Sequence, residues 1–341
     1  MDIRSLDLNE LTEYLVKNGY QKFRAKQVYE WIHKKHVRSV DEMTNVPKEL
    51  RNEIDLSLNS VVVADRLVSG IDGTNKFVFK LHDGNVIESV FMPYNHGNSV
   101  CISSQVGCRM GCRFCASTLL GLERNLTAGE MLDQIYAIER QTGERVSNVV
   151  VMGTGEPLDN YDNLCRFIRM ISDENGLNIS QRNITVSSCG MVPEIRKLAD
   201  EKFAITFALS LHAATDEKRK RLMPIADRYS ISEVMDVCRY YYDTTGRRIT
   251  FEYSLVAGEN DTREDAYDLS HLLKNFTCHV NLIPVNPIKE REYKRSGRDS
   301  VEKFKLLLEK NRIKVTIRRS MGKDIEAACG QLRKAYIESD C

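Results

Sequence analysis

Beyond about residue 125 the chain alternates short apolar runs with amphipathic segments, and this alternation restricts the possible folds more than any other feature. The apolar runs, typical of buried strands, lie at 148–153, 183–190, 204–212, 249–256, 279–287 and 314–320. Helical patterns cover 160–172, 230–243, 262–275 and 299–311, and a capping box at Thr127 and Glu130 predicts one more helix. Such alternation predicts a parallel sheet with right-handed crossovers, either open and doubly wound or a full or partial β/α barrel. Ligands of these folds bind at the carboxyl ends of the strands.

The first part of the chain has a different pattern. Residues 1 to about 55 are helical in pattern, with Leu8, Leu11 and Leu15 on one face. From about residue 61 the pattern changes to alternating strands, with an Asp83-Gly84 turn typical of a hairpin. We therefore expect three parts: a helical accessory domain at 1–60, a β-hairpin extension at 61–98 and a core domain at 99–341.

Composition excludes some classes of protein. The 341 residues carry 49 Lys and Arg against 48 Asp and Glu, so a net charge of +1 gives no global argument for nucleic-acid binding. The N-terminus lacks the basic and apolar regions of a secretory signal, and no stretch approaches the ~20 apolar residues of a membrane span. We expect a cytoplasmic protein that does not enter a membrane. Its ten cysteines then indicate metal binding, catalysis or buried thiols rather than disulfides.

Three of these cysteines form a C-x3-C-x2-C pattern. Cys108, Cys112 and Cys115 follow a strand that we expect to end at Gln105, and the loop contains a glycine. Three thiolates on a [4Fe–4S] cluster leave one iron without a protein ligand, and S-adenosylmethionine (SAM) can chelate that open position. The pattern therefore predicts one such cluster in each chain.

Two other interpretations of the cysteines stay open at this point. Cys101 could complete a tetrahedral zinc site with the three thiols, although structural zinc sites usually show two paired C-x2-C elements and no second pair exists here. Buried free thiols are the other possibility. The cysteines that stand alone within helix or strand patterns are best explained as small buried residues: Cys165, Cys189, Cys238 and Cys278.

The sequence around the cysteines resembles a known family. The motifs that carry the resemblance are SSQVGC before the cluster pattern, GTGEPL at 153–158, SLH at 210–212, LIPVNP at 282–287 and DIEAACGQLR at 324–333. Together they are similar to the radical SAM adenine methyltransferases of RNA, the RlmN/Cfr group, over residues 20 to 337. The resemblance implies an α/β fold, a partial (β/α)6 radical SAM barrel with an N-terminal helical accessory domain.

The resemblance also implies roles for two more cysteines. Cys329 of AACGQL matches the cysteine that the family methylates from a first SAM, and Cys101 matches a cysteine seven positions before the cluster pattern. In the family's mechanism a second SAM yields a radical that removes hydrogen from this methyl, and the carbon radical adds to carbon 2 of adenine. Attack of Cys101 on the Cys329 sulfur then releases the product as a disulfide forms. On local sequence alone, Cys329 could equally be a small packed residue.

Further residues are assigned by the resemblance alone. Those implied to contact SAM are Gly155, Glu156, Ser187, Ser210, Leu211, His212 and Asn286. Taken singly, a Glu before Pro or a Ser at a strand end is typical of a turn or a cap. Glu88 matches the family's suggested general base, and the plain alternative is an exposed carboxylate on a strand.

Two basic segments are candidates for RNA binding. Between Lys17 and Arg38 lie seven Lys or Arg and one Glu, with Tyr20, Phe23, Tyr29 and Trp31 among them. Cations interleaved with aromatics suit single-stranded or looped RNA, whereas a solvated helix face whose aromatics form a local core explains the same residues. A second run, KEREYKRSGR at 289–298, could contact the substrate backbone.

The implied function is methylation of carbon 2 of an adenosine in the peptidyl-transferase centre of 23S ribosomal RNA and of an adenosine in tRNA. The resemblance also implies that two SAM are consumed per turnover and that a protein such as flavodoxin or ferredoxin supplies the electrons. It further implies that the protein is a monomer. Methylation of carbon 8 of the same adenine, which confers antibiotic resistance, is the nearest alternative. A non-catalytic iron–sulfur or zinc RNA-binding protein and a radical SAM enzyme acting on a small molecule are the others.

Overall fold

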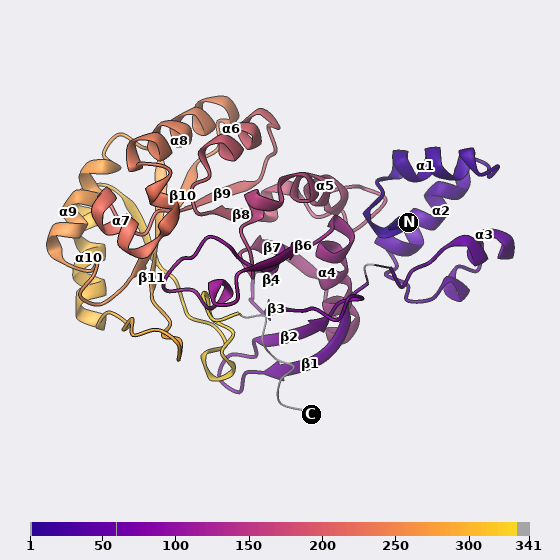
Figure 1. The fold of residues 1–341 in the computed structure, drawn as a ribbon, viewed down its shortest axis with the longest axis horizontal. Coiled ribbons are helices and arrows are strands. Elements are labelled where there is room, and N and C mark those ends of the chain that lie inside the picture. The colour runs from indigo at the N-terminus through magenta and orange to yellow at the C-terminus, as the bar shows by residue number, and fades with distance from the viewer. Residues whose placement is uncertain (1, 59, 333–341) are drawn as a thin grey trace.

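The computed structural model describes residues 2–58 and 60–332, so 333–341 of the expected core segment lie outside it. The described residues form a ten-stranded sheet with helices packed around it, and a small two-stranded sheet (Figure 1). The large sheet contains, in spatial order, β1 (Val62–Val68), β2 (Asn75–Lys80), β3 (Val86–Met92), β4 (Asn98–Ile102), β7 (Val146–Val151), β8 (Ile184–Ser188), β9 (Thr206–Ser210), β10 (Ile249–Leu255), β11 (Cys278–Pro284) and β12 (Lys314–Ile317). The small sheet pairs β5 (Gln105–Gly107) with β6 (Leu122–Asn125).

Strand direction divides the large sheet at β4. The pairs from β1 to β4 are antiparallel, and the β2–β3 hairpin turns at the expected Asp83-Gly84. Every pair from β4 to β12 is parallel. Within the described chain β1 pairs only with β2 and β12 only with β11, so the barrel stays open. The predicted partial β/α barrel is confirmed, and all six predicted apolar runs contain strands of it.

The helices follow the crossovers between the parallel strands. They are α4 (Ala128–Thr142), α5 (Tyr161–Ile171), α6 (Val192–Asp200), α7 (Asp216–Leu222), α8 (Ile231–Thr245), α9 (Arg263–Leu272) and α10 (Arg298–Lys310). Thr127 caps α4 in the predicted capping box with Glu130. The patterns did not reveal α6 and α7. The sequence of α7, DEKRKRL, has too few apolar residues for a helical period to stand out.

The N-terminal helices α1 (Leu8–Lys17), α2 (Phe23–His33) and α3 (Lys48–Glu53) lie to one side of the barrel, beside α4 and α5 (Figure 1). Leu11 and Leu15 are buried, as their shared face predicts. The buried His33 Nδ1 lies 2.8 Å from the Tyr136 hydroxyl of α4, which joins these helices to the barrel. The remaining short elements are 3-10 helices at Ile3–Ser5, Val40–Glu42, Ala116–Thr118, Pro157–Asn160, Gln181–Asn183, Pro224–Asp227 and Lys323–Ile325. No helix among the described residues is long and apolar enough to span a membrane.

The structure corrects one predicted boundary. The strand expected to end at Gln105 is β4, which ends at Ile102, and Gln105 instead begins β5. The strand breaks at Ser103. Its hydroxyl donates to the Glu88 carbonyl (2.6 Å) across the sheet, and its backbone N–H donates to a side chain of α4 rather than to a neighbouring strand. The loop with the three cysteines therefore lies between β5 and β6 of the small sheet.

That side chain is Gln134, which is fully buried on α4. Its Oε1 accepts from the Ser103 backbone N–H (2.9 Å) and the Ser89 hydroxyl (2.7 Å), and its Nε2 donates to the Ser103 carbonyl (3.0 Å). One amide thus joins α4, β3 and the end of β4. A buried amide of this kind stabilises the fold only when its donors and acceptors are hydrogen-bonded.

We predict that Gln134→Leu lowers the free energy of unfolding by about 2–4 kcal/mol, because two buried backbone groups of Ser103 lose their partners. Urea unfolding of the variant and the wild type measures this loss. Gln141→Leu, the same change at an exposed position of α4, is the matched control and should have little effect. Equal losses in the two variants would show that the network contributes nothing specific.

Candidate functional site

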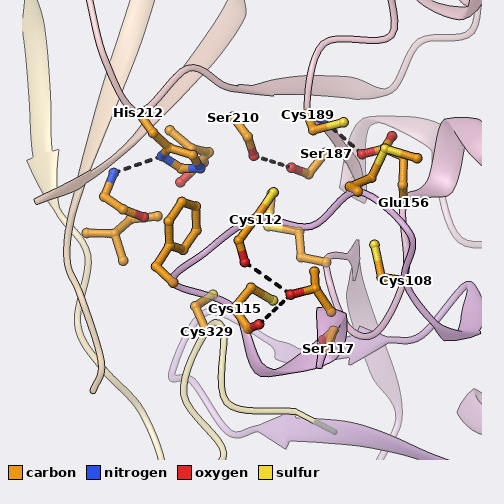
Figure 2. Close-up of a pocket in the computed structure, with 18 of the residues that line it drawn as sticks. Cys108, Cys112, Cys115, Ser117, Glu156, Ser187, Cys189, Ser210, His212 and Cys329 are labelled. Carbon is orange, nitrogen blue, oxygen red and sulfur yellow. Dashed lines mark hydrogen bonds between the residues drawn. The ribbon is translucent and has the colours of Figure 1, made fainter. Parts of the chain in front are cut away.

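The carboxyl ends of the parallel strands surround a cavity, here called the inner cavity (Figure 2). Ser187, Ser210 and His212 lie along one side of it, and Cys115 and Cys329 lie along the other (Figure 2). Most of the residues singled out in the sequence line it: Cys108, Cys112, Cys115, Gly155, Glu156, Ser187, Ser210, His212, Asn286 and Cys329. The parallel barrel thus gathers residues that are spread over more than two hundred positions of the chain.

The loop between β5 and β6 directs three thiols into the inner cavity. It closes tightly, because a Cβ at Gly107 would lie 1.9 Å from the Gly121 carbonyl oxygen, so only glycine fits there. The Thr118 hydroxyl donates to the carbonyls of Cys112 (3.1 Å) and Cys115 (2.9 Å), which fixes the second half of the loop.

Burial keeps the three thiols protonated in the absence of a cation. It is the main reason why the pKa of Cys108 is raised to about 12 and why the pKa values of Cys112 and Cys115 are also raised. A metal centre supplies the positive charge that turns such thiols into thiolates. The donor set therefore fits a metal centre that binds through sulfur.

Its arrangement fits a cluster with several irons better than a single ion. Among the described residues, no three His, Cys, Asp or Glu side chains lie close enough together to hold one metal ion. Cys101, which the zinc interpretation needs as a fourth ligand, does not line the inner cavity. Three separate thiols suit three corners of a [4Fe–4S] cluster, because each one binds a different iron.

The GTGEP segment after β7 forms one wall of the inner cavity. Gly155 has a φ of +109°, and a Cβ there would meet the Gln105 Cβ at 2.6 Å, so the backbone must approach this closely without a side chain. Glu156 is buried and accepts from the backbone N–H groups of Cys189 (2.8 Å) and Leu158 (3.1 Å). Burial raises the pKa of Glu156, and these hydrogen bonds oppose the rise. Glu156 thus caps the 3-10 helix at Pro157–Asn160, and it also lines the inner cavity.

The adjoining wall comes from β8 and β9. The hydroxyls of Ser187 and Ser210 lie 3.3 Å apart. His212 is buried, and its Nδ1 accepts from the Ser254 backbone N–H (2.9 Å). Burial and, less strongly, Arg219 lower the pKa of His212 to about 3, so the ring is neutral and carries its proton on Nε2. Leu211, in contrast, is fully buried and does not line the cavity.

A C-terminal segment, residues 318–332, brings Cys329 to the inner cavity. Asn286, which lies just beyond β11, donates from its Nδ2 to the Cys329 carbonyl (3.1 Å). The next carbonyl, that of Gly330, accepts from the Ala116 N–H (2.8 Å) in the cysteine loop. Cys329 is thus held between the end of the barrel and the loop that carries Cys115.

The same segment is also fastened to the turn between β1 and β2. Asp72 accepts from the Gly322 N–H (3.0 Å), and Asp324 accepts from the Ser69 hydroxyl (2.7 Å). Gly322 has a φ of +60°, and a Cβ there would meet the Ala327 Cβ at 2.7 Å. These contacts fix the path along which the segment crosses from β12 to the cysteine loop.

Cys101 and Cys329 line a second cavity, here called the thiol cavity, which adjoins the inner cavity and shares Cys115 and Cys329 with it. Cys101 lies in β4 and is only 7% exposed. Burial, followed by the neighbouring Cys329, raises the pKa of Cys101 to about 12. No disulfide joins the two cysteines, and both are free. The tertiary structure thus brings together two thiols that are 228 positions apart.

Glu88 does not match its plain interpretation as an exposed strand carboxylate. It is 2% exposed in β3 and forms an ion pair with Lys76 Nζ of β2 (3.2 Å). It lines neither the inner cavity nor the thiol cavity, although Val90 on the same face of β3 lines the thiol cavity. Glu88 is buried because both faces of β3 are covered in the fold.

Sequence reasoning missed Arg318 and Glu252. Arg318 follows β12 and lines both cavities, and its guanidinium lies 3.7 Å from the carboxylate of the buried Glu252. The pKa of Arg318 is raised, mainly by Cys329, with burial opposing and Glu252 and Cys101 adding to the rise. A carboxylate inside the apolar run ITFEYSLV was the signal that could have identified Glu252. Nothing in the sequence placed Arg318 beside the two thiols.

Cys189 has a position that the sequence did not reveal. It is buried, as predicted for Cys165, Cys189, Cys238 and Cys278 alike, but it also lines the inner cavity beside Cys112. Its position after β8 puts it at the end of the barrel where ligands bind.

The basic N-terminal segment has a mixed structure. Tyr29 is fully buried in the local core, as the plain interpretation predicts. Phe23 is 50% exposed with Arg24 over its ring, and Lys35 lies 3.3 Å from the centre of the Trp31 ring. The exposed cations are Lys17, Lys22, Lys26, Lys34, Lys35 and Arg38. This surface therefore presents both cations and aromatic rings.

Comparisons with known proteins agree with the geometry. Residues 102–270 match the Radical SAM superfamily, and residues 1–58 match the ribosomal RNA large subunit methyltransferase N-terminal domain. The chain is 62% identical to "Probable dual-specificity RNA methyltransferase RlmN" of Lachnoclostridium phytofermentans, over 99% of this chain and 96% of that protein. The protein of the same name from Lachnospira eligens is 61% identical over 99% and 97%. A radical SAM methyltransferase from Sphaerobacter thermophilus superposes with a TM-score of 0.94 at 42% identity, covering 98% of this chain and all of that one.

We predict that Cys112→Ser abolishes cluster binding after anaerobic reconstitution, because one iron loses its thiolate. Iron and acid-labile sulfide per chain are the measurements. Cys189→Ser removes a thiol from the same cavity and is the matched control. It should retain iron, and an equal loss in both variants would show that the three-cysteine ligand set is wrong.

Proposed function

The chain belongs to the RlmN family of radical SAM methyltransferases, and we propose that it methylates carbon 2 of an adenosine in 23S ribosomal RNA and in tRNA. The ribosomal target is the peptidyl-transferase centre. The observation that carries this proposal is the meeting of Cys101 and Cys329 in one cavity that adjoins the three-cysteine loop. A radical SAM enzyme that only generated a radical would need the loop but not this pair.

Three thiols and the strand-end residues are the proposed cofactor site. When bound, a [4Fe–4S] cluster with SAM supplies the methyl groups and the radical chemistry, with two SAM used per turnover. Cys108, Cys112 and Cys115 would hold the cluster. The neutral His212 offers an Nε2–H donor, and the carboxylate of Glu156 can accept from an ammonium group. The other proposed SAM contacts are Gly155, Ser187, Ser210, Leu211 and Asn286, of which Leu211 could act only through its backbone.

Cys329 is the proposed methyl carrier. Asn286 fixes its backbone, and Arg318 places a positive charge near its sulfur. A thiolate is the nucleophile that displaces a methyl from a sulfonium, and a nearby guanidinium stabilises that thiolate. Asn286 thus orients Cys329, and Arg318 activates its sulfur.

Cys101 is the proposed resolving thiol. After the methylene carbon bridges Cys329 and adenine, the Cys101 thiolate attacks the Cys329 sulfur. The new S–S bond forms as the bond between the Cys329 sulfur and the methylene carbon breaks. The electron pair of that S–C bond goes to the methylene carbon, which gains a proton and becomes the methyl group on the base. A reductant must then reopen the disulfide before another turnover. Because burial raises the pKa of Cys101 to about 12, release of the product should accelerate as pH rises.

Glu88 enters this proposal as the general base only by resemblance. Its carboxylate is buried against Lys76 and lines neither cavity, so proton transfer from the base would need a relay. The division at 1–60, 61–98 and 99–341 is also part of the proposal, with the first segment binding RNA through its exposed cations. A flavodoxin or ferredoxin donor, a monomer and a cytoplasmic location complete it.

We predict that the reconstituted enzyme, incubated anaerobically with reductant, SAM and protein-free 23S ribosomal RNA, produces 2-methyladenosine and 5′-deoxyadenosine. Mass spectrometry of digested nucleosides against carbon-2 and carbon-8 standards identifies the product. Cys329→Ala should reduce product by at least ~10³-fold, because no methyl carrier remains. Carbon-8 product alone would overturn the regiochemistry, and absence of both methylated nucleosides would overturn the function.

Cys101→Ala should accumulate a covalent RNA–protein adduct through Cys329, because the adduct forms but cannot be resolved. A denaturing gel and peptide mass spectrometry detect it. Cys278→Ala removes a buried thiol from the start of β11, away from both cavities, and should accumulate none. Normal turnover by Cys101→Ala would rule out the resolving role.

A further inference from the structure

A wide groove, here called the outer groove, leads from the thiol cavity to the surface. Its walls are residues 93–96 after β3 and residues 316–321 and 323 at and after β12, with Asp72 and Arg295 beside them. It shares Tyr94 and residues 318–321 with the thiol cavity. The two therefore form one continuous path from the surface to Cys329 and Cys101.

Positive charge dominates this groove. Arg295, Arg318, Arg319 and Lys323 line it, against one carboxylate, Asp72. Within the described residues, Arg319 and Lys323 form no ion pair, and both are exposed. Asp72 is already engaged, because its carboxylate accepts from the N–H groups of Gly322 (3.0 Å) and Thr74 (3.1 Å).

An aromatic pair stands beside these cations. The rings of Tyr94 and His96 are stacked, with centroids 5.1 Å apart and planes 20° from parallel. A hydrogen bond from the Gly97 N–H to the Tyr94 carbonyl (3.1 Å) closes the turn that carries them. His96 is exposed, so one ring is available to solvent. Aromatic rings next to cations are the usual surface for unstacked bases and their phosphates.

We propose that the outer groove binds the RNA strand that flanks the target adenosine. Arg319 and Lys323 contact its phosphates, and the Tyr94–His96 pair stacks on a neighbouring unstacked base. The inference rests on the proposed function and deepens it, because it assigns the site of the flanking nucleotides. These residues lie outside both basic segments noted in the sequence, apart from Arg295 of the run at 289–298.

Continuity with the thiol cavity favours RNA over another anionic partner. An adenine that reaches Cys329 must leave its stack, and its neighbours on the strand must then lie within a nucleotide or two of the thiol cavity. The outer groove is the path that adjoins this cavity. Arg295 links the two physically, since its guanidinium lies 3.3 Å from the Ser320 hydroxyl and 3.4 Å from Asn286 Oδ1, the residue that holds Cys329.

The test is a titration of the reconstituted full-length enzyme with protein-free 23S ribosomal RNA at several salt concentrations. Arg319→Glu should weaken binding by at least about 10-fold and reduce the salt slope by about 0.7 for each phosphate that the variant no longer neutralises. Tyr94→Ala and His96→Ala should each weaken binding about 5- to 100-fold, and Tyr94→Phe should recover most of the loss because the ring remains. KM for RNA should rise more than kcat falls.

Lys310→Glu is the matched charge control, because this exposed lysine of α10 lies toward the other end of β12. It should bind RNA like the wild type. If Arg319→Glu and His96→Ala also bind like the wild type while the wild type makes methyladenosine, the groove assignment is wrong and the proposed function stands. If these variants lose turnover only with a protein reductant and not with a chemical one, the groove binds an acidic electron donor, which also overturns the proposal.

Discussion

The backbone pairing of β4 is the constraint on which the site depends. This strand pairs antiparallel with β3 on one side and parallel with β7 on the other. It therefore joins the antiparallel strands β1–β3 to the parallel barrel. Gln134 locks the end of β4 against α4 and forces the chain out of the large sheet at Ser103. As a result Cys101 faces the thiol cavity, and the cysteine loop begins on a separate small sheet. A shift of β4 by one residue would turn Cys101 to the opposite face.

The turn between β1 and β2, which lies outside the parallel barrel, helps to hold the segment that carries Cys329. Cys329 belongs to a segment with little regular structure of its own, and its position comes from contacts at both ends. Asp72 and Asp324 fasten one end to the turn between β1 and β2, and Asn286 fastens the Cys329 backbone to the barrel. A short segment held at several places keeps one sulfur in position while a substrate enters beside it.

Burial sets the protonation of the whole site. The inner cavity lowers the pKa of His212 and raises that of Cys108, so a neutral imidazole and protonated thiols face the space that the cofactors would fill. Charge is instead concentrated at Arg318, between the two cavities, and along the outer groove. A buried interior with a cationic approach suits an enzyme that draws in a polyanion and then reacts with an extruded base.

The sequence by itself determined the class of fold, because six apolar runs separated by helical patterns can bury their faces only in a parallel sheet with crossovers. Local spacing also identified the three-cysteine loop, and the resemblance supplied Cys329 and Cys101. The sequence could not show that β4 stops before Gln105, that Glu88 is buried, or that Arg318 stands beside the two thiols. Those features depend on contacts between residues far apart in the chain, and periodicity records only neighbours. Tertiary structure alone decided which thiols share a cavity.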